Sequence, residues 1–454
     1  MTGGQSPLGL SFEHSTPAPP VNHRTNSQPN GQNLSAPVTG QAPSIRLTTQ
    51  SSSAAGTPVY QSTLLTSQSS SAPSTTQASS TLLISQTSSA SGTSQAFQTQ
   101  AMDTPLPVDE QSPHFETLEL IPKNVTVHRS TLRNDVIEIF KDSEIFKYKL
   151  AATITDTRGQ PEKGEGRGVF LEVLSQFWQE CFTSFMVGRI EKVPFIRHDL
   201  QRPEWEAIAR VLVYGYRMEK YFPLNLSKLL VAVCLFGDEV INDDFLLKSF
   251  RDFVAAEDRQ VLDSCFMDSF EADDDVIDFL SSFKCFKVAT AENIHSIITE
   301  LAHQEMVQKP RYVVDCWAPT LHLLRSDPRF QTLEGLEQLY ESKQPTARKI
   351  IRLFRADPVN DAQRQSFEHL KRFVKSLEGN SLSTFMRFLT GSDVLTENSI
   401  QISFTNLDGF ERRPVARTCG PLLELPSTYE SYPALAEEFT SIMREEMAWS
   451  FVIA

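Results

Sequence analysis

The sequence predicts an α+β protein in which a large, mostly helical part is followed by a small α+β part, with a disordered arm preceding both. Three observations predict this class. The first hundred of the 454 residues contain 22 Ser, 15 Thr and 12 Gln but only three charged side chains. From about residue 118 to residue 377 apolar side chains recur mainly at helical spacing. Beyond residue 381 short alternating segments are mixed with short helices.

The arm, residues 1–115, has too few large apolar side chains to offset the entropy of an ordered chain, so we expect it to be disordered. It contains seven Ser/Thr-Gln pairs. These pairs fit a flexible tether, and they also fit a tract that is phosphorylated at several sites. The whole chain has a net charge of −14, of which the first hundred residues contribute almost nothing.

The first elements expected after the arm are a short strand or hairpin at 118–121 and 125–127 and a helix at 134–140. A Gly-x-Gly-x-Gly run at 164–168 precedes a strongly apolar stretch at 169–187. The glycine spacing is not that of a dinucleotide-binding loop, and no clear strand precedes it. We therefore interpret the run as a turn that leads into a buried helix.

Helical periodicity predicts ten further helices up to residue 377, several of them with an acidic residue in the first turn. They span 205–216, 226–236, 243–254, 258–266, 274–283, 291–304, 312–324, 333–340, 347–354 and 362–377. The run Glu378-Gly379-Asn380-Ser381 then interrupts the pattern, and Gly and Asn often end helices.

After this break the pattern predicts a short helix at 385–389, strands at 400–404, 414–419 and 422–425, and an amphipathic helix at 432–447. The last six residues are mostly apolar, which predicts that the terminus is docked. The predicted organisation is a disordered arm at 1–115, a helical part at 116–378, a hinge at 379–381 that includes Gly379 and Asn380, and an α+β part at 382–454.

Composition excludes several classes of function. No run of about 18 apolar residues exists, so no membrane span and no membrane partner are expected. The acidic balance argues against nucleic acid as a partner. The six cysteines lie at least 20 residues apart without a Cys-x-x-Cys pair, so we expect no structural metal. No phosphate-binding loop and no secretory signal are present, which predicts no cofactor and a place in the cytoplasm, the nucleus or both.

Cys419 differs from the other cysteines in its sequence surroundings. It follows three arginines, Arg412, Arg413 and Arg417, in an otherwise acidic chain. Guanidinium groups near a thiol favour its reactive thiolate form. Cys181, Cys234 and Cys285 lie among large apolar side chains, where an inert buried thiol is the usual outcome. Cys419 is therefore the candidate nucleophile.

The segment from Arg417 to Tyr429, with Thr418-Cys419, then Leu423-Glu-Leu-Pro426 and a tyrosine, resembles the catalytic loop of HECT-type ubiquitin ligases. Cys419 lies 35 residues before the end and Phe451 is the fourth residue from it, as in that family. Further similar segments are 166–175, 207–216 and 388–392. The resemblance covers about 117–454. It is strongest to a divergent vertebrate group related to the cell-cycle (G2-to-M phase) ubiquitin ligase.

The resemblance implies a bilobal fold, with a large helical N-lobe hinged to a small α+β C-lobe. It also implies that Cys419 accepts ubiquitin from a ubiquitin-conjugating enzyme as a thioester and passes it to a lysine of a protein substrate. In that scheme Thr418 positions the loop and Arg417 supports the thiolate. Phe451 orients the C-lobe for transfer, although a plain core aromatic is an equally good interpretation of this residue.

The sequence departs from the pattern of this family at two places, and these departures leave other functions open. Gly420 and Pro421 replace the residues that usually follow the catalytic cysteine, and the region 243–288 looks short and helical where the family has a strand-rich insert that recruits the conjugating enzyme. The alternative is therefore a weak or inactive HECT-like scaffold that binds ubiquitin or partner proteins. A cysteine hydrolase is a third option, but no His follows His369 to act as a nearby base.

Overall fold

The structure, a computed structural model, describes residues 120–164 and 166–444 of the chain. These residues form a mixed α and β protein that is predominantly helical and has three small sheets. The predicted arm, Phe451 and the apolar terminus lie outside the described residues. The fold class is thus confirmed at the level of a mainly helical α+β protein.

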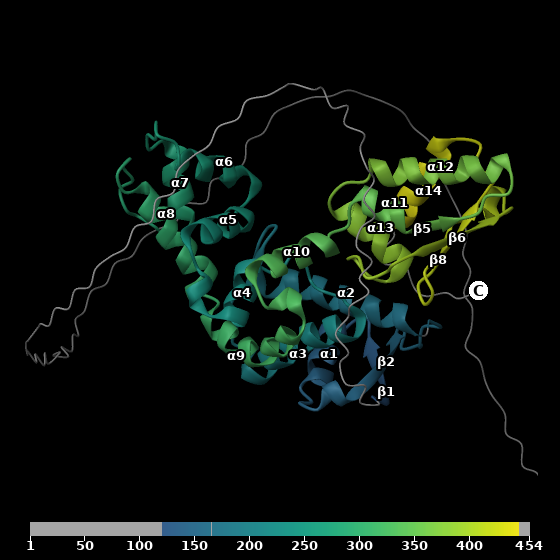
Figure 1. Ribbon diagram of the computed structural model, residues 1–454, viewed down its shortest axis with the longest axis horizontal. Coiled ribbons are helices and arrows are strands. Elements are labelled where there is room, and N and C mark those ends of the chain that lie inside the picture. Colours follow the sequence, from purple (N-terminus) through teal and green to yellow (C-terminus); the bar gives the residue numbers. More distant parts are fainter. Residues whose placement is uncertain (1–119, 165, 445–454) are drawn as a thin grey trace, which may run out of the picture. The chain divides into compact units, whose positions relative to one another are not determined.

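The described chain begins with two parallel strands joined by a helix. β1 (Ile121–His128) pairs in parallel with β2 (Tyr148–Thr155), and α1 (Leu132–Phe140) connects them. Alternate residues of β2 are buried, including Leu150 and Ile154, which gives this strand one face toward the core. β2 was not predicted. Of the two interpretations of the first alternating segments, the strand is correct and the hairpin is wrong, because residues 121–128 form one continuous strand. Figure 1 shows β1 and β2 side by side next to α1.

Helix α2 (Arg167–Ser184) follows the glycine-rich turn as predicted. Its N-cap residue, Gly166, has a φ of 90°, a left-handed value that glycine adopts without strain. The helix is buried almost throughout, and Trp178 packs edge-on against the ring of Trp317. It ends earlier than predicted, because a short antiparallel hairpin of β3 (Met186–Gly188) and β4 (Lys192–Pro194) begins at residue 186.

The helices that follow match the periodic pattern and carry recognisable caps. α3 begins with a capping box between Gln201 and Glu204. Asn242, Asp273 and Thr332 each accept a backbone hydrogen bond at the start of their own helix. The helices are α3 (Arg202–Glu219), α4 (Lys228–Phe236), α5 (Asp243–Phe253), α6 (Ala256–Ser264), α7 (Asp274–Ser282), α8 (Ile294–His303), α9 (Arg311–Leu321) and α10 (Leu333–Lys343).

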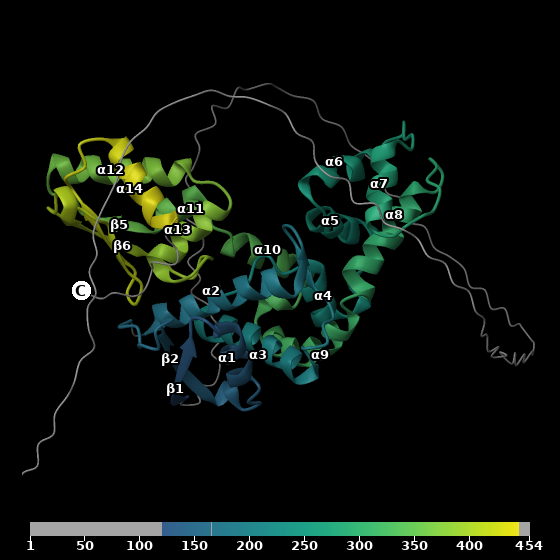
Figure 2. The ribbon, with the colours of Figure 1, turned by 180° about the vertical axis from the view of Figure 1, so that it is seen from behind.

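The last hundred described residues build a four-stranded sheet with helices packed on it. The strand order is β5-β6-β8-β7, and only the pairing of β7 with β8 is antiparallel. α12 contacts both α14 and β8, and Figures 1 and 2 both show α12 beside α14. The elements are α11 (Ala347–Leu353), β5 (Phe354–Ala356), α12 (Asp361–Ser376), α13 (Asn380–Thr390), β6 (Ile400–Thr405), β7 (Val415–Arg417), β8 (Leu422–Pro426) and α14 (Tyr432–Arg444).

The buried apolar side chains of the described residues fall into two clusters. The first runs from Val125 to Tyr340 and takes in Val394, and the second runs from Ile350 to Phe439. The chain therefore passes from one core to the next between Tyr340 and Ile350, where α10 ends and α11 begins.

This position differs from the predicted hinge. Gly379, with a φ of 50°, caps the start of α13, and Asn380 is the first residue of that helix. The break at 379–381 joins α12 to α13, and both helices contribute to the second cluster. Gly and Asn allow a sharp turn between two helices of one core just as they allow a turn between two domains, so the local signal could not distinguish the two cases.

Candidate active site

Cys419 lies in the turn that joins two antiparallel strands. β7 ends at Arg417 and β8 starts at Leu422, and these two residues face each other in the register. The Cys419 side chain is exposed, whereas Cys181, Cys234, Cys265 and Cys316 are buried. Burial raises the pKa of the Cys181 thiol well above its ordinary value and that of Cys265 to about 11. Among the six cysteines, Cys419 is thus the exposed thiol placed on a turn, as the sequence predicted.

The turn that carries Cys419 rests on the first turn of α2. A Cβ atom built on Gly168 would lie 2.4 Å from Thr418 Oγ1, and one built on Gly166 would lie 3.7 Å from Cys419 Sγ. The missing Cβ of Gly168 therefore lets the loop approach the α2 backbone, whereas the distance at Gly166 is an ordinary van der Waals contact. Because the positive end of the helix dipole lies at this turn, it favours negative charge there.

Thr418 faces the helix, and its Oγ1 atom is buried without a hydrogen-bond partner among the described residues. The threonine side chain thus contacts the α2 backbone through van der Waals packing. This placement is compatible with the predicted role of Thr418 in positioning the loop, which stays a prediction.

Arg417 forms an ion pair with a residue of the neighbouring strand. Its Nε donates to Glu424 Oε1 at 2.8 Å, across the pair of β7 and β8. A second arginine of the predicted basic cluster, Arg412, pairs with Glu438 at 3.4 Å and lies over the Tyr429 ring. Carboxylates in β8 and α14 therefore offset much of the positive charge that the sequence alone placed beside Cys419. The sequence could not reveal this, because those carboxylates approach only through sheet pairing and helix packing.

A polar stripe along α2 meets the second cluster, and the sequence analysis did not identify it. Gly168, Glu172, Ser175 and Gln179 follow one another at intervals of three or four residues, so they share one face of the helix. Ser175 Oγ donates to the carbonyl oxygen of Gly391 at 2.9 Å and accepts from the backbone N–H of Asp393 at 3.2 Å. We call these four residues the α2 polar stripe. Their spacing within an otherwise apolar helix was the available signal.

Glu172 is the buried centre of this stripe. Arg387, on α13, donates from Nε at 2.9 Å and from Nη2 at 2.7 Å to the two carboxylate oxygens. Arg129 donates to the same carboxylate at 3.0 Å. Burial alone would raise the pKa of the Glu172 carboxyl, but the two arginines together hold that pKa below its ordinary value. The fork geometry of Arg387 fixes α13 against α2 in one orientation.

Two more contacts tie the same regions together. Arg167, the first residue of α2, pairs with Glu219 of α3 and with Glu397. Gly391 has a φ of 80°, and a Cβ atom there would lie 2.3 Å from the Gly168 carbonyl oxygen. The stretch from Gly391 to Glu397 thus packs against the start of α2, beside the Thr418 contact.

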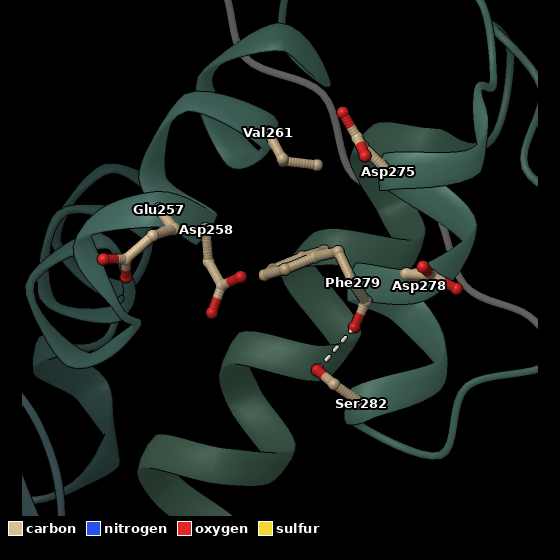
Figure 3. A pocket seen from close by; sticks show the side chains of 7 residues that line it. All are labelled: Glu257, Asp258, Val261, Asp275, Asp278, Phe279 and Ser282. Carbon is tan, nitrogen blue, oxygen red and sulfur yellow. Dashed lines mark hydrogen bonds between the residues drawn. The ribbon is translucent and has the colours of Figure 1, made fainter. Parts of the chain in front are cut away.

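A separate acidic hollow lies between α6 and α7. Figure 3 shows the Phe279 ring directed into it and carboxylates from both helices around it. The residues that line it are Glu257, Asp258, Val261, Asp275, Asp278, Phe279 and Ser282. Residues 255–282 carry nine Asp or Glu and one Arg, a net charge of −8. Within the described residues the four lining carboxylates make no ion pair, so this surface is strongly negative.

Neither a family model nor a curated protein matches the chain. In the described residues, no group of three or more His, Cys, Asp or Glu side chains is arranged to hold a metal ion. No helix within 120–164 and 166–444 is both long and apolar enough to cross a membrane.

Proposed function

We propose that the chain is a ubiquitin transferase of the HECT type, with Cys419 as its acceptor thiol. The observation that carries the proposal is the exposed Cys419 on the turn between β7 and β8, directly after Thr418 and before the Leu-Glu-Leu-Pro run of β8. The proposal assigns the first hydrophobic cluster to the N-lobe and the second to the C-lobe. The segment between Tyr340 and Ile350 is then the connection between the lobes.

The proposed reaction requires little from the residues that neighbour Cys419. The Cys419 thiolate attacks the carbonyl carbon of the ubiquitin thioester on a conjugating enzyme, a carbon–sulfur bond forms, and the thiolate of the conjugating enzyme leaves. A substrate lysine amine then attacks the new thioester, a carbon–nitrogen bond forms, Cys419 leaves as a thiolate, and the amine loses a proton. Because each thioester is already activated, no strong base beside Cys419 is needed.

The test is a charging assay with the purified full chain. It is incubated with activating enzyme, a broad panel of conjugating enzymes and ubiquitin, and the products are separated with and without a reductant. We expect a reducible ubiquitin adduct that is lost in Cys419→Ala and kept in Cys285→Ala, the matched control at the half-buried cysteine. Absence of an adduct with every conjugating enzyme would refute the proposal.

A second candidate is a HECT-like scaffold without transferase activity. It is favoured by one observation: residues 243–288 contain the helices α5, α6 and α7 and no strand, where the family has a strand-rich recruiting insert. This candidate predicts that ubiquitin or a partner protein binds while no thioester forms. Isothermal titration of ubiquitin into the chain, run beside the charging assay, separates the two functions.

A further inference from the structure

We infer that Glu172 is a positioning residue for Cys419: through Arg387 it docks the turn of Thr418 and Cys419 on the first turn of α2. The functional consequence rests on the proposed transferase activity. The docking itself does not, because it follows from contacts within the chain.

The contacts between the two clusters are mostly polar. Only Val394 joins the first cluster from the residues described beyond Tyr340. The polar contacts that join them include the Glu172 and Arg387 ion pair, the hydrogen bonds of Ser175 and the pairing of Arg167 with Glu397. Arg387 also donates to Gln179, and Thr418 and Gly391 both approach the backbone of Gly168. A polar interface can separate with a smaller loss of apolar burial than a hydrophobic one, so its ion pairs set its position.

Glu172 is the member of this interface with the strongest geometric constraint. The Glu172 side chain is 5% exposed and the Arg387 side chain is 11% exposed. The carboxylate and the guanidinium group are joined by two parallel hydrogen bonds. Gly168, one turn earlier on the same face, contacts Thr418 directly. α13 also contacts β7, the strand that leads into the cysteine turn. A shift of α13 on α2 therefore also moves this turn relative to Gly168.

The short distance between Gly166 and Cys419 allows docking of the turn to be measured through an engineered disulfide. A Cβ atom on Gly166 would lie 3.8 Å from Cys419 Cβ, which is within the separation of about 3.5–4.5 Å found in disulfides. A Gly166→Cys variant should therefore form a disulfide with Cys419 when the turn is docked. The positive φ at this position strains the new cysteine equally in every background, so the disulfide rates can be compared with one another. The full chain is used, with Cys285→Ser to remove the half-buried thiol.

The experiment measures the rate of this disulfide under a mild oxidant, read out by peptide mass after non-reducing digestion. We expect the rate to fall at least threefold when Glu172→Gln is added, and also with Ser175→Ala, a milder change. Glu337→Gln removes the exposed ion pair with Lys248 and should leave the rate unchanged. Gly237→Cys, another positive-φ glycine with nothing within 4 Å of its Cβ, should give no disulfide with Cys419.

Equal rates in all backgrounds, or no disulfide in a folded Gly166→Cys chain, would overturn the inference. Thermal unfolding of each variant checks that the chain is folded at the temperature of the assay. In the charging assay we expect Glu172→Gln to slow adduct formation at least threefold. If the disulfide responds as expected but no variant and no parent chain is ever charged, the docking stands and the proposed transferase function fails.

Discussion

At the scale of single residues, the contact between Gly168 and Thr418 gives a direct prediction. Glycine in a helix costs about 1 kcal/mol relative to alanine, so a Gly-to-Ala change in α2 would ordinarily stabilise the chain. At Gly168 the added Cβ would lie 2.4–2.5 Å from Thr418 Oγ1 and from the Thr418 backbone. We expect Gly168→Ala to lose that gain and to lower the melting temperature, because the cysteine turn must move away.

Gly420 is the matched control for this variant. It lies in the same turn, beside Cys419, and a Cβ atom there would meet nothing within 4 Å. Gly420→Ala should change the free energy of unfolding by no more than ~0.5 kcal/mol. Hydrogen exchange of residues 415–421 completes the measurement, since loss of docking should raise exchange there in Gly168→Ala. A stabilised Gly168→Ala chain with unchanged exchange would contradict the packing described above.

The sequence was informative at this scale where a property depends on near neighbours along the chain. Cys181 and Cys234 are buried and Cys419 is exposed, as their flanking residues indicated. Cys285, which its apolar neighbours in the sequence also placed in the core, is only half-buried. The environment of Arg417 depends on Glu424 in the next strand, so it could not be inferred locally. Gly168 was interpreted as part of a turn, and its contact with Thr418 spans about 250 positions of the chain.

At the scale of the elements, long amphipathic helices were predictable because their periodicity and caps are local. The structure has α3, α5, α7 and α12 close to the predicted ranges. The strands β2, β3, β4 and β5 were missed. β3 and β4 have three residues each, and β2 is defined by its pairing with β1 rather than by a turn signal. Such pairing is a tertiary property, which sequence periodicity does not contain.

The ion pair between α2 and α13 predicts a dependence of stability on pH. The folded chain lowers the pKa of the Glu172 carboxyl below its ordinary 4.5. The stabilisation from the ionised carboxylate is therefore complete above about pH 4.5 and is lost as the pH falls through the folded-state pKa. We expect Glu172→Gln to lower the free energy of unfolding by about 3 kcal/mol at pH 7, since the largely buried Arg387 guanidinium loses its carboxylate partner.

Denaturant unfolding of both chains at several pH values checks this expectation. The difference between parent and Glu172→Gln should be constant from pH 7 to about pH 5 and narrow below about pH 4.5. The nearby Asp393 affects the pH dependence of stability in the opposite direction. Burial raises the pKa of its carboxyl, so its contribution to the free energy of unfolding falls as the pH rises through the folded-state pKa. Asp393 is present in both chains, so it largely cancels in the difference. A difference that widens in acid would contradict the role given to Glu172.

At the scale of the whole molecule, the order of the parts was predictable and the boundary between them was not. The change from long helices to short mixed elements is visible in composition and periodicity. The boundary between the two buried clusters, by contrast, depends on which side chains pack together. The second cluster includes Ile350, Phe373 and Ile400, from both sides of the predicted hinge. α11 and α12 therefore pack with the strands that follow them.

Two clusters joined by a mainly polar interface predict that unfolding of the full chain is not a single cooperative transition. Each cluster has its own buried aromatic side chains, such as Trp178 in the first and Phe373 in the second. Scanning calorimetry should therefore give a calorimetric enthalpy larger than the van't Hoff enthalpy. Glu172→Gln should separate the two transitions further, because it removes the strongest contact that couples them, whereas Glu337→Gln should leave their separation unchanged. Equal enthalpies in the parent chain would mean that the polar interface couples the clusters as tightly as a shared core, and that the docked turn of Cys419 is released only by global unfolding.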